Sequence, residues 1–215
     1  MVPRVRALLP AAGQSVRFGG TTPKQYVQLL GKPVLARSIE AVRQHPAVAA
    51  VTVVLARNDS VYDELVRPAF PEVSTTTGGD SRAQSVLNGL QYIRSIDEHC
   101  KWVLVHDAAR PCLAAASLAD LISHGLASEH GAILAIPVSD TLKRQQEPGR
   151  IGRTLNRSGL WAAQTPQLFA LDVLINAMQA AIGSRIPPTD ESEAMERAGF
   201  HPLLVQGSSR NIKLT

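Results

Sequence analysis

The segment VRALLPAAGQSVRFGGTTPKQ, residues 5–25, begins as an apolar run and opens at Pro10 into a loop of small residues. An apolar run followed directly by glycines is typical of a buried parallel strand whose carboxyl end meets a ligand. Two isolated cations, Arg17 and Lys24, stand in this loop. Small residues let backbone N–H groups approach phosphate closely, and the two cations suit a polyphosphate. The segment predicts an anion site, although the glycines alone are equally compatible with a solvated surface loop.

The remainder of the sequence alternates between strand and helix patterns. Further apolar or β-branched runs predict strands at residues 50–56, 73–77, 102–106, 132–138 and 201–205. Helical spacing predicts helices at residues 33–45, between a cap at 58–60 and residue 70, after the glycines at 78–79, and at 117–128, 171–182 and 191–198. This alternation favours a doubly wound, mostly parallel α/β sheet of the Rossmann-like kind, with helices on both faces. Pro33 suits a first helical position.

Residues 139–169 break the alternation. This stretch is turn-like, with Pro148 and Gly149 near its middle, and predicts a protruding hairpin in place of a crossover helix. We expect one domain, residues 1–215, with an arm at about 139–160. Because a hairpin outside its domain cannot bury both faces alone, we expect a homodimer that pairs through the arm.

Composition excludes several classes of protein. Aromatic residues make up 4% of the chain and its cations are scattered, which argues against a nucleic-acid partner. The net charge of +4 fits either a solvated basic surface or one that attracts anions. No apolar run approaches the roughly 20 residues that a membrane span needs. Cys100 and Cys112 lie outside metal and redox motifs, and no signal peptide is visible, so we expect reduced thiols in a cytoplasmic protein.

Two common nucleotide-binding patterns are absent. The P-loop requires Gly-Lys followed by Ser or Thr, and the dinucleotide fingerprint requires GxGxxG. The first loop has glycines only at positions 13, 19 and 20 and matches neither pattern.

A set of ordered motifs supplies a more specific signal. PAAGQSVRFGG, TTPKQY, GGDSRAQSV, HDAARPC, PVSDTLKR, NRSGLWAAQTPQ, TDESEAMERAGFHP and NIKLT resemble, in this order, the 2-C-methyl-D-erythritol 4-phosphate cytidylyltransferase family. The resemblance implies a nucleotidyltransferase fold and a reaction of CTP with a branched polyol phosphate. Its products are a CDP-polyol and pyrophosphate, in the non-mevalonate isoprenoid pathway. Members usually continue past the NIK motif into a further helix, whereas this sequence ends at Thr215.

The resemblance also implies roles for individual residues. It assigns nucleotide binding to Pro10, Ala11, Ala12, Gly13, Arg17, Lys24, Gly79, Asp80, Ser85 and Ala108. It assigns polyol phosphate binding to Asp107, Thr141, Arg157, Thr165 and Lys213. Catalytic roles fall to four cations, Arg17, Lys24, Arg157 and Lys213. The first two stabilise the charged transition state and the last two orient the incoming phosphate.

Structural interpretations of the same residues stand beside these roles. The glycines before Asp80 also suit a plain turn with Asp80 as the helix cap, and Arg157 and Lys213 also suit surface charges. Asp107 ends a strand and is the predicted ligand of Mg²⁺, which one carboxylate and phosphates can hold. An ionised substrate phosphate needs no general base, so we interpret His106 as structural.

Two other functions remain open from the sequence. One is a cytidylyltransferase for another polyol phosphate, such as ribitol 5-phosphate, and the other is a nucleotide-binding module without turnover. The presence of Arg17, Lys24 and Asp107 together favours an enzyme. Residue patterns do not distinguish CTP from other nucleotides.

Overall fold

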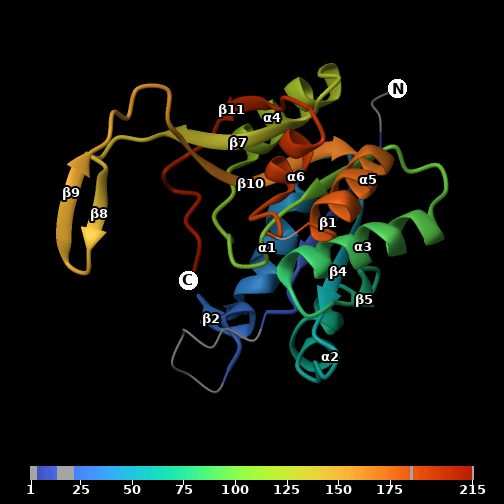
Figure 1. Ribbon diagram of the computed structural model, residues 1–215. Helices are drawn as coiled ribbons and strands as arrows, with labels where there is room; N and C mark the ends of the chain where they lie inside the picture. Colours follow the sequence, from blue (N-terminus) through green and yellow to red (C-terminus); the bar gives the residue numbers. More distant parts are fainter. Residues whose placement is uncertain (1–3, 14–21, 185, 215) are drawn as a thin grey trace.

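A seven-stranded sheet organises the chain in the computed structural model, which describes residues 4–13, 22–184 and 186–214 (Figure 1). The strand order is β11-β7-β10-β6-β1-β4-β5. The strands are β1 (Val5–Pro10), β4 (Val48–Leu55), β5 (Ser74–Thr77), β6 (Trp102–Val105), β7 (Ala132–Pro137), β10 (Trp161–Ala170) and β11 (Leu203–Gln206). All the strands predicted outside the arm are confirmed, within a few residues at their ends.

Strand β1 lies inside the sheet, next to the central strand β6, and pairs in parallel with β4 and β6. Leu8 lies opposite Thr52 on one side and Val105 on the other. The pairs β4–β5 and β7–β11 are also parallel, and only β10 runs antiparallel to its two neighbours. The mostly parallel sheet is therefore confirmed, and the ends of β1, β4 and β6 deliver their loops to one edge.

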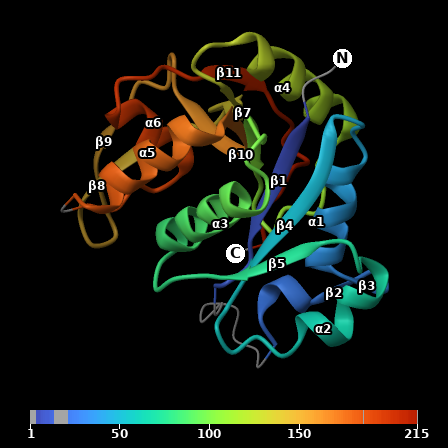
Figure 2. The ribbon, with the colours of Figure 1, turned by 90° about the vertical axis from the view of Figure 1, so that its right-hand side faces the viewer.

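Helices lie on both faces of this sheet (Figure 2), and a hydrophobic core lies between the sheet and each set of helices. Helices α1 (Val34–Arg43) and α4 (Ala115–Ala127) cover one face, where the side chains of Ala7 and Leu9 are buried. Helices α3 (Arg82–Ile96), α5 (Leu171–Ile182) and α6 (Glu191–Arg197) cover the other, where Leu8 is buried. Successive strand residues point to opposite faces, so the continuous apolar run of β1 feeds both cores.

The arm is shorter than the break in sequence pattern indicated. Only β8 (Lys143–Glu147) and β9 (Arg150–Thr154) form the projecting hairpin, and every residue of both strands is exposed (Figure 1). The prediction that residues 139–169 protrude as a whole is wrong. Residues 161–170 instead form β10, which lies inside the main sheet between β6 and β7. This strand was not predicted because polar residues that are buried in the fold interrupt its apolar pattern, among them Gln164, Thr165 and Gln167.

Proline explains two smaller differences. The helix expected up to residue 70 divides into α2 (Tyr62–Leu65) and the 3₁₀ turn η3 (Arg67–Ala69). Pro68 has no N–H group to continue an α-helix. The N-cap of α2 is Val61, one residue after the expected cap region, and Asp59 accepts hydrogen bonds from the backbone N–H groups of Val61 and Tyr62. Pro33 ends the short hairpin of β2 (Gln28–Leu29) and β3 (Lys32–Pro33) and precedes α1 as its N-cap.

Candidate active site

Two loops meet at the carboxyl ends of β1 and β5. A Cβ atom added at Gly78 would lie 2.6 Å from Cβ of Ala12, so the loop at 78–81 approaches the first loop closely because residue 78 has no side chain. The buried hydroxyl of Ser85 accepts a hydrogen bond from the N–H of Gly79 (3.1 Å) and donates one to the carbonyl of Ser81 (2.8 Å). Ser85 therefore fixes the loop from behind.

The cap of α3 is Ser81, whose side chain accepts a hydrogen bond from the N–H of Gln84 at 3.1 Å. The alternative reading of Asp80 as this cap is therefore wrong. Asp80 is instead exposed beside Gly79, at the predicted nucleotide loop.

Residues 11–13 of the first loop are also held by a neighbouring side chain. Gln25, in the 3₁₀ turn η2 (Lys24–Tyr26), donates from Nε2 to the carbonyls of Ala11 (2.9 Å) and Gly13 (3.3 Å). Ala11 is buried, whereas Gly13 is exposed. Lys24 begins this turn and is half-buried, so its position beside the loop is set by the same hydrogen bonds. Arg17 lies outside the described residues.

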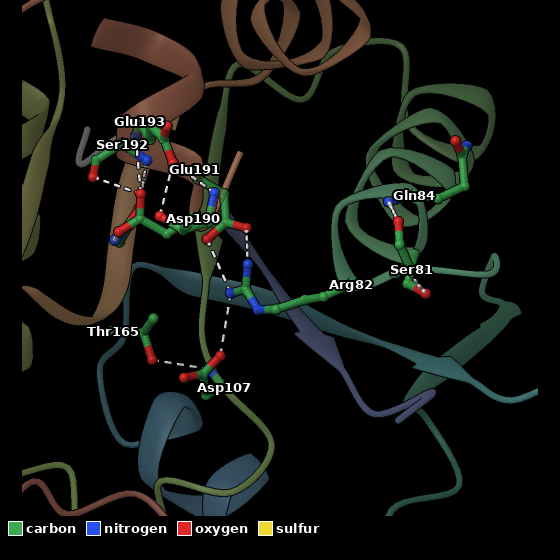
Figure 3. A network of polar contacts seen from close by, with 12 residues as sticks. Ser81, Arg82, Gln84, Asp107, Thr165, Asp190, Glu191, Ser192 and Glu193 are labelled. Atoms are coloured by element: carbon green, nitrogen blue, oxygen red, sulfur yellow. Dashed lines mark hydrogen bonds and ion pairs between the residues drawn. The ribbon is translucent and has the colours of Figure 1, made fainter. Parts of the chain in front are cut away.

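Asp107 is the centre of a cluster of charges at the end of β6, and Figure 3 shows the part of it formed with Arg82 and Glu191. Its Oδ1 lies 3.1 Å from Nη2 of Arg82, and its Oδ2 lies 2.8 Å from Nζ of Lys213. Nε of Arg110 lies 3.5 Å from Oδ2, an ion-pair distance. Arg82 in turn holds Glu191, with Nη1 2.7 Å from Oε1 and Nη2 3.2 Å from Oε2. Five charged groups from four segments of the chain therefore meet here.

The surrounding cations control the ionisation of Asp107. The side chain is almost buried, and burial by itself acts to raise the pKa of a carboxyl group. Arg82 and Lys213 outweigh this effect, so the pKa of Asp107 lies well below its usual range. Asp107 is consequently a permanent negative charge that holds two cations in place.

His106 is buried and serves Asp107 structurally. Its Nε2–H donates to the carbonyl of Arg110 at 3.0 Å, and its Nδ1 accepts from the hydroxyl of Thr165 at 3.1 Å. The same hydroxyl oxygen accepts from the N–H of Asp107 at 2.9 Å. Burial lowers the pKa of His106 to about 4, so the ring is neutral near pH 7. Both ring nitrogens are occupied, which agrees with the structural interpretation.

A short C-terminal segment brings Lys213 to Asp107. Asn211 is buried, and its Nδ2 donates to the carbonyl of Thr165 at 2.9 Å. Its own carbonyl accepts from Nη1 of Arg110 at 2.6 Å, and the N–H of Leu214 donates to the carbonyl of Ala109 at 2.9 Å. Lys213 therefore lies between two tethers to the rest of the protein.

The structure brings together part of the predicted site. The two loops predicted to bind the nucleotide include or adjoin Pro10, Ala11, Ala12, Gly13, Lys24, Gly79, Asp80 and Ser85. The charge cluster includes or adjoins Asp107, Ala108, Thr165 and Lys213. Ala108 is buried, and its carbonyl accepts from the hydroxyl of Ser38. Thr141 and Arg157 are exposed next to the arm, and no hydrogen bond or ion pair within the described ranges joins either to the Asp107 cluster.

The residues around Asp107 do not fit a Mg²⁺ ion held by the protein. Mg²⁺ requires oxygen ligands in near-octahedral geometry, but both oxygens of Asp107 face cationic side chains. In the part of the chain that the structure describes, no three His, Cys, Asp or Glu side chains gather to hold a metal ion. A divalent cation at Asp107 would be repelled by Arg82 and Lys213, which already contact its two oxygens.

Several residues of the site were not among those predicted. Arg82 and Glu191 stand inside the quoted motifs GGDSRAQSV and TDESEAMERAGFHP, yet only the folded chain shows that they pair. Gln25 and Asn211 likewise hold the loops through side-chain amides. Only their positions in the sequence could have indicated these residues. Arg82, Gln25 and Asn211 lie within one to three residues of a predicted site residue, and Glu191 is the first residue of a helix.

Known proteins are similar to this chain in sequence. A family model described as IspD, 2-C-methyl-D-erythritol 4-phosphate cytidylyltransferase, matches residues 5–215. The chain is 43% identical to the 2-C-methyl-D-erythritol 4-phosphate cytidylyltransferase of Vibrio vulnificus (strain CMCP6), over 97% of this chain and 88% of that protein. It is 44% identical to that of Tolumonas auensis (strain DSM 9187 / NBRC 110442 / TA 4), over 97% and 90%.

Solved structures agree with these relatives. A crystal structure of 4-diphosphocytidyl-2C-methyl-D-erythritol synthase superposes with a TM-score of 0.87 at 41% identity, covering 100% of this chain and 94% of that one. The cytidylyltransferase of Francisella tularensis superposes with a TM-score of 0.80 at 33% identity, covering 99% and 94%. Among the helices in the described part of the chain, none combines the length and apolar character needed for a membrane span. The match over nearly the whole sequence and over the fold shows that this chain belongs to the 2-C-methyl-D-erythritol 4-phosphate cytidylyltransferase family.

Proposed function

We propose that the chain joins CTP and 2-C-methyl-D-erythritol 4-phosphate, in the non-mevalonate isoprenoid pathway, by direct attack of the polyol phosphate on the α-phosphorus of CTP. Pyrophosphate leaves, and the product is 4-diphosphocytidyl-2-C-methyl-D-erythritol. Membership of the family makes the chain a cytidylyltransferase. The observation that carries the assignment of residues is the Asp107 cluster, in which Asp107 pairs with Lys213 and with Arg82, the first residue of the helix that follows the second loop.

The nucleotide half of the site consists of the two loops. Backbone N–H groups of Ala12, Gly13 and Asp80 are proposed to bind CTP, and Ala11 and Gly79 to line its binding site, because small residues let the backbone approach the ligand. The N–H groups of Ala11 and Gly79 already bond Val54 and Ser85. Lys24 and Arg17 are proposed to stabilise the negative charge that develops on the phosphates as the new bond forms. The support is that Gln25, which follows Lys24, bonds the carbonyls of Ala11 and Gly13 and so holds Lys24 beside residues 11–13.

The polyol half is built on the charge cluster. Two anions must meet in this reaction, so cations have to neutralise the incoming phosphate. Lys213 is proposed to bind that phosphate, while Asp107 holds Lys213 in place. Thr165 is proposed to act in the same half; its hydroxyl already bonds His106 and Asp107, which makes it an anchor for this loop. Thr141 and Arg157 are proposed to complete the pocket from an arm.

We also propose a requirement for Mg²⁺ or a similar cation, bound to the phosphates of CTP. Mg²⁺ commonly binds through substrate phosphates, with few protein ligands, and neutralises part of their charge. This proposal replaces ligation by Asp107 with ligation by the nucleotide, because the carboxylate already faces Arg82 and Lys213.

A homodimer through the arm is part of the proposal. Strands β8 and β9 form a separate two-stranded sheet, and Ile151 on β9 is 68% exposed. Isolated two-stranded hairpins are marginally stable in water, so a second copy is the natural cover for this surface. Sedimentation would test the dimer, and cell fractionation would test the cytoplasmic location expected from the sequence.

A pyrophosphate-release assay tests the proposed function. The expected result is turnover with CTP and 2-C-methyl-D-erythritol 4-phosphate, and at least tenfold lower kcat/KM with UTP or with ribitol 5-phosphate. Turnover preferring ribitol 5-phosphate would assign the chain to another polyol. Nucleotide binding without pyrophosphate release from any polyol phosphate would make it a binding module.

A further inference from the structure

A buried carboxylate lies behind the charge cluster, without any place in the roles proposed above. Glu191 begins helix α6 and has none of its surface exposed to solvent. Burying a charge is costly unless it is paired. Among the described residues, the partner of this carboxylate is Arg82, which binds it with both terminal nitrogens (Figure 3).

The guanidinium of Arg82 connects Glu191 to Asp107 and, through it, to Lys213. Nη2 of Arg82 lies 3.2 Å from Glu191 and 3.1 Å from Oδ1 of Asp107. Oδ2 of the same Asp107 lies 2.8 Å from Nζ of Lys213. A continuous series of charge-assisted contacts therefore runs from Glu191 through Arg82 and Asp107 to Lys213.

Glu191 is itself held rigidly. Gln167 of β10 accepts from the N–H of Ser192 at 2.9 Å and donates to Asp190 at 3.0 Å. Asp190 caps α6 by accepting from the N–H of Glu193 at 2.8 Å. Because these bonds tie the start of α6 to the main sheet, Glu191 presents its carboxylate from a fixed point.

We infer that Glu191 is a positioning residue, which orients Asp107 and Lys213 toward the polyol phosphate by holding Arg82 between two carboxylates. Three cations face two carboxylates in this cluster, leaving one positive charge for an anionic substrate. Without the charge of Glu191, Arg82 has only Asp107 as its anionic partner. The guanidinium then turns toward both oxygens of Asp107 and displaces Lys213. The inference rests on the roles proposed for Asp107 and Lys213.

The test compares Glu191→Gln with Glu193→Gln. The two residues lie on the same helix and lose the same charge, but Glu193 contacts Arg197 and Thr189, which lie outside the charge cluster. For Glu191→Gln we expect KM for 2-C-methyl-D-erythritol 4-phosphate to rise about tenfold or more, with KM for CTP within about twofold of wild type. Displacements of about 1 Å in a reacting group can cost up to about 100-fold in rate. Glu193→Gln should keep both values.

A purely structural role predicts a different result. In that case Glu191→Gln lowers the melting temperature while both KM values stay at wild-type levels below it, and this outcome overturns the inference. Glu191→Asp keeps the charge and should recover most of the lost affinity for the polyol phosphate; no recovery counts against positioning by charge.

A second variant covers failure to fold. Arg82→Gln combined with Glu191→Gln leaves neither member of this pair charged, and Asp107 loses its partner at Oδ1. A raised KM for the polyol phosphate is expected in this double variant, and an unchanged one overturns the inference. Failure of the proposed function is seen separately: wild-type protein would lack turnover, or Lys213→Ala would leave KM for the polyol phosphate unchanged.

Discussion

Nζ of Lys213 lies 2.8 Å from Oδ2 of Asp107, and this ion pair joins the C-terminal segment to the loop that follows the central strand β6. Asp107 is nearly buried, while Lys213 keeps about a third of its side chain exposed. The carboxylate thus fixes a cation whose other face is open to an anion. An incoming phosphate therefore binds a cation that is already in position, which lowers the entropy cost of ordering the Lys213 side chain on binding.

Replacing Lys213 with Ala should therefore weaken binding of the polyol phosphate. A hydrogen bond to a charged group contributes about 1.5–3 kcal/mol, which corresponds to a rise in KM of roughly 10- to 100-fold. KM for CTP should change little. Arg210→Ala is the matched control, because Arg210 is an exposed cation of the same segment. Equal effects of the two substitutions on KM would mean that Lys213 contributes only general positive charge.

The sheet could be predicted from the sequence because its strands are continuous apolar runs. β1, β4 and β7 are buried on both faces, which demands apolar side chains at consecutive positions. The sequence of β10 does not follow this pattern, because polar residues interrupt its apolar run. Its residues Gln164, Thr165 and Gln167 are buried but satisfied by hydrogen bonds to Ser208, Asp107 and Asp190, partners that become visible only in the folded chain.

The charge cluster could be predicted only in part for the same reason. Asp107 follows an apolar strand, and ligands bind at strand ends in such sheets. The sequence therefore predicts that Asp107 belongs to the site. Arg82 and Glu191 stand 109 residues apart and meet only when α3 and α6 pack on the same face. Nothing in either local sequence distinguishes a buried ion pair from two surface charges.

The first loop provides the second prediction. Arg17→Ala and Lys24→Ala should each lower kcat by about 10²–10³, the loss typical of one fixed group that stabilises developing charge. Steady-state assays at saturating CTP and polyol phosphate measure it. Lys101→Ala is the control, since Lys101 is an exposed cation at the start of β6. A normal kcat with only a raised KM for CTP would show binding without transition-state stabilisation.

Metal dependence provides the third prediction. Excess chelator should abolish turnover, and added Mg²⁺ should restore it. Asp107→Asn should lower kcat/KM for the polyol phosphate by at least tenfold, because Arg82 and Lys213 lose the charge that holds them. If the nucleotide carries the metal, the Mg²⁺ concentration for half-maximal activity should be the same in this variant as in wild type. A large increase in that concentration would instead restore Asp107 as a ligand, and full activity in chelator would end the metal proposal.

The fourth prediction concerns stability and pH. Burial lowers the pKa of His106 to about 4, with the carbonyl of Arg110, the hydroxyl of Thr165 and the charges of Asp107 and Arg110 beside it. As pH falls below the ordinary value of 6.5, the unfolded chain binds a proton that the folded chain rejects. The contribution of the neutral ring to the free energy of unfolding should therefore be complete above pH 6.5. As the pH falls to 4, the free energy of unfolding should decrease by about 3 kcal/mol.

Urea unfolding between pH 7 and pH 4, without substrates or divalent cations, measures this loss. His106→Gln should reduce the slope over this range, although it lowers stability at pH 7 as well. His99→Gln, at an exposed position, should leave the slope nearly unchanged. Parallel slopes for wild type and His106→Gln would show that burial of the neutral ring is not what makes the protein sensitive to acid.

The arm provides the last prediction. Thr141 and Arg157 are exposed at the base of a hairpin that projects from the body, so we expect them to complete the site of a neighbouring copy. Subunits carrying Arg17→Ala and subunits carrying Arg157→Ala should each be nearly inactive alone. If arms act across a dimer, each mixed dimer has one site with both defects and one site with neither. Random exchange makes about half of the dimers mixed, so activity should recover to roughly a quarter of wild type.

A second mixture of variants is the control for recovery of activity that does not depend on the arm. Arg17→Ala and Lys24→Ala both alter the body of the protein, so every site in their mixed dimers keeps one defect, and no recovery is expected. If each arm serves its own subunit, the mixture of Arg17→Ala and Arg157→Ala also leaves both sites of every dimer defective. Absence of recovery there, with subunit exchange verified by two tags, would therefore assign Arg157 to the site of its own chain.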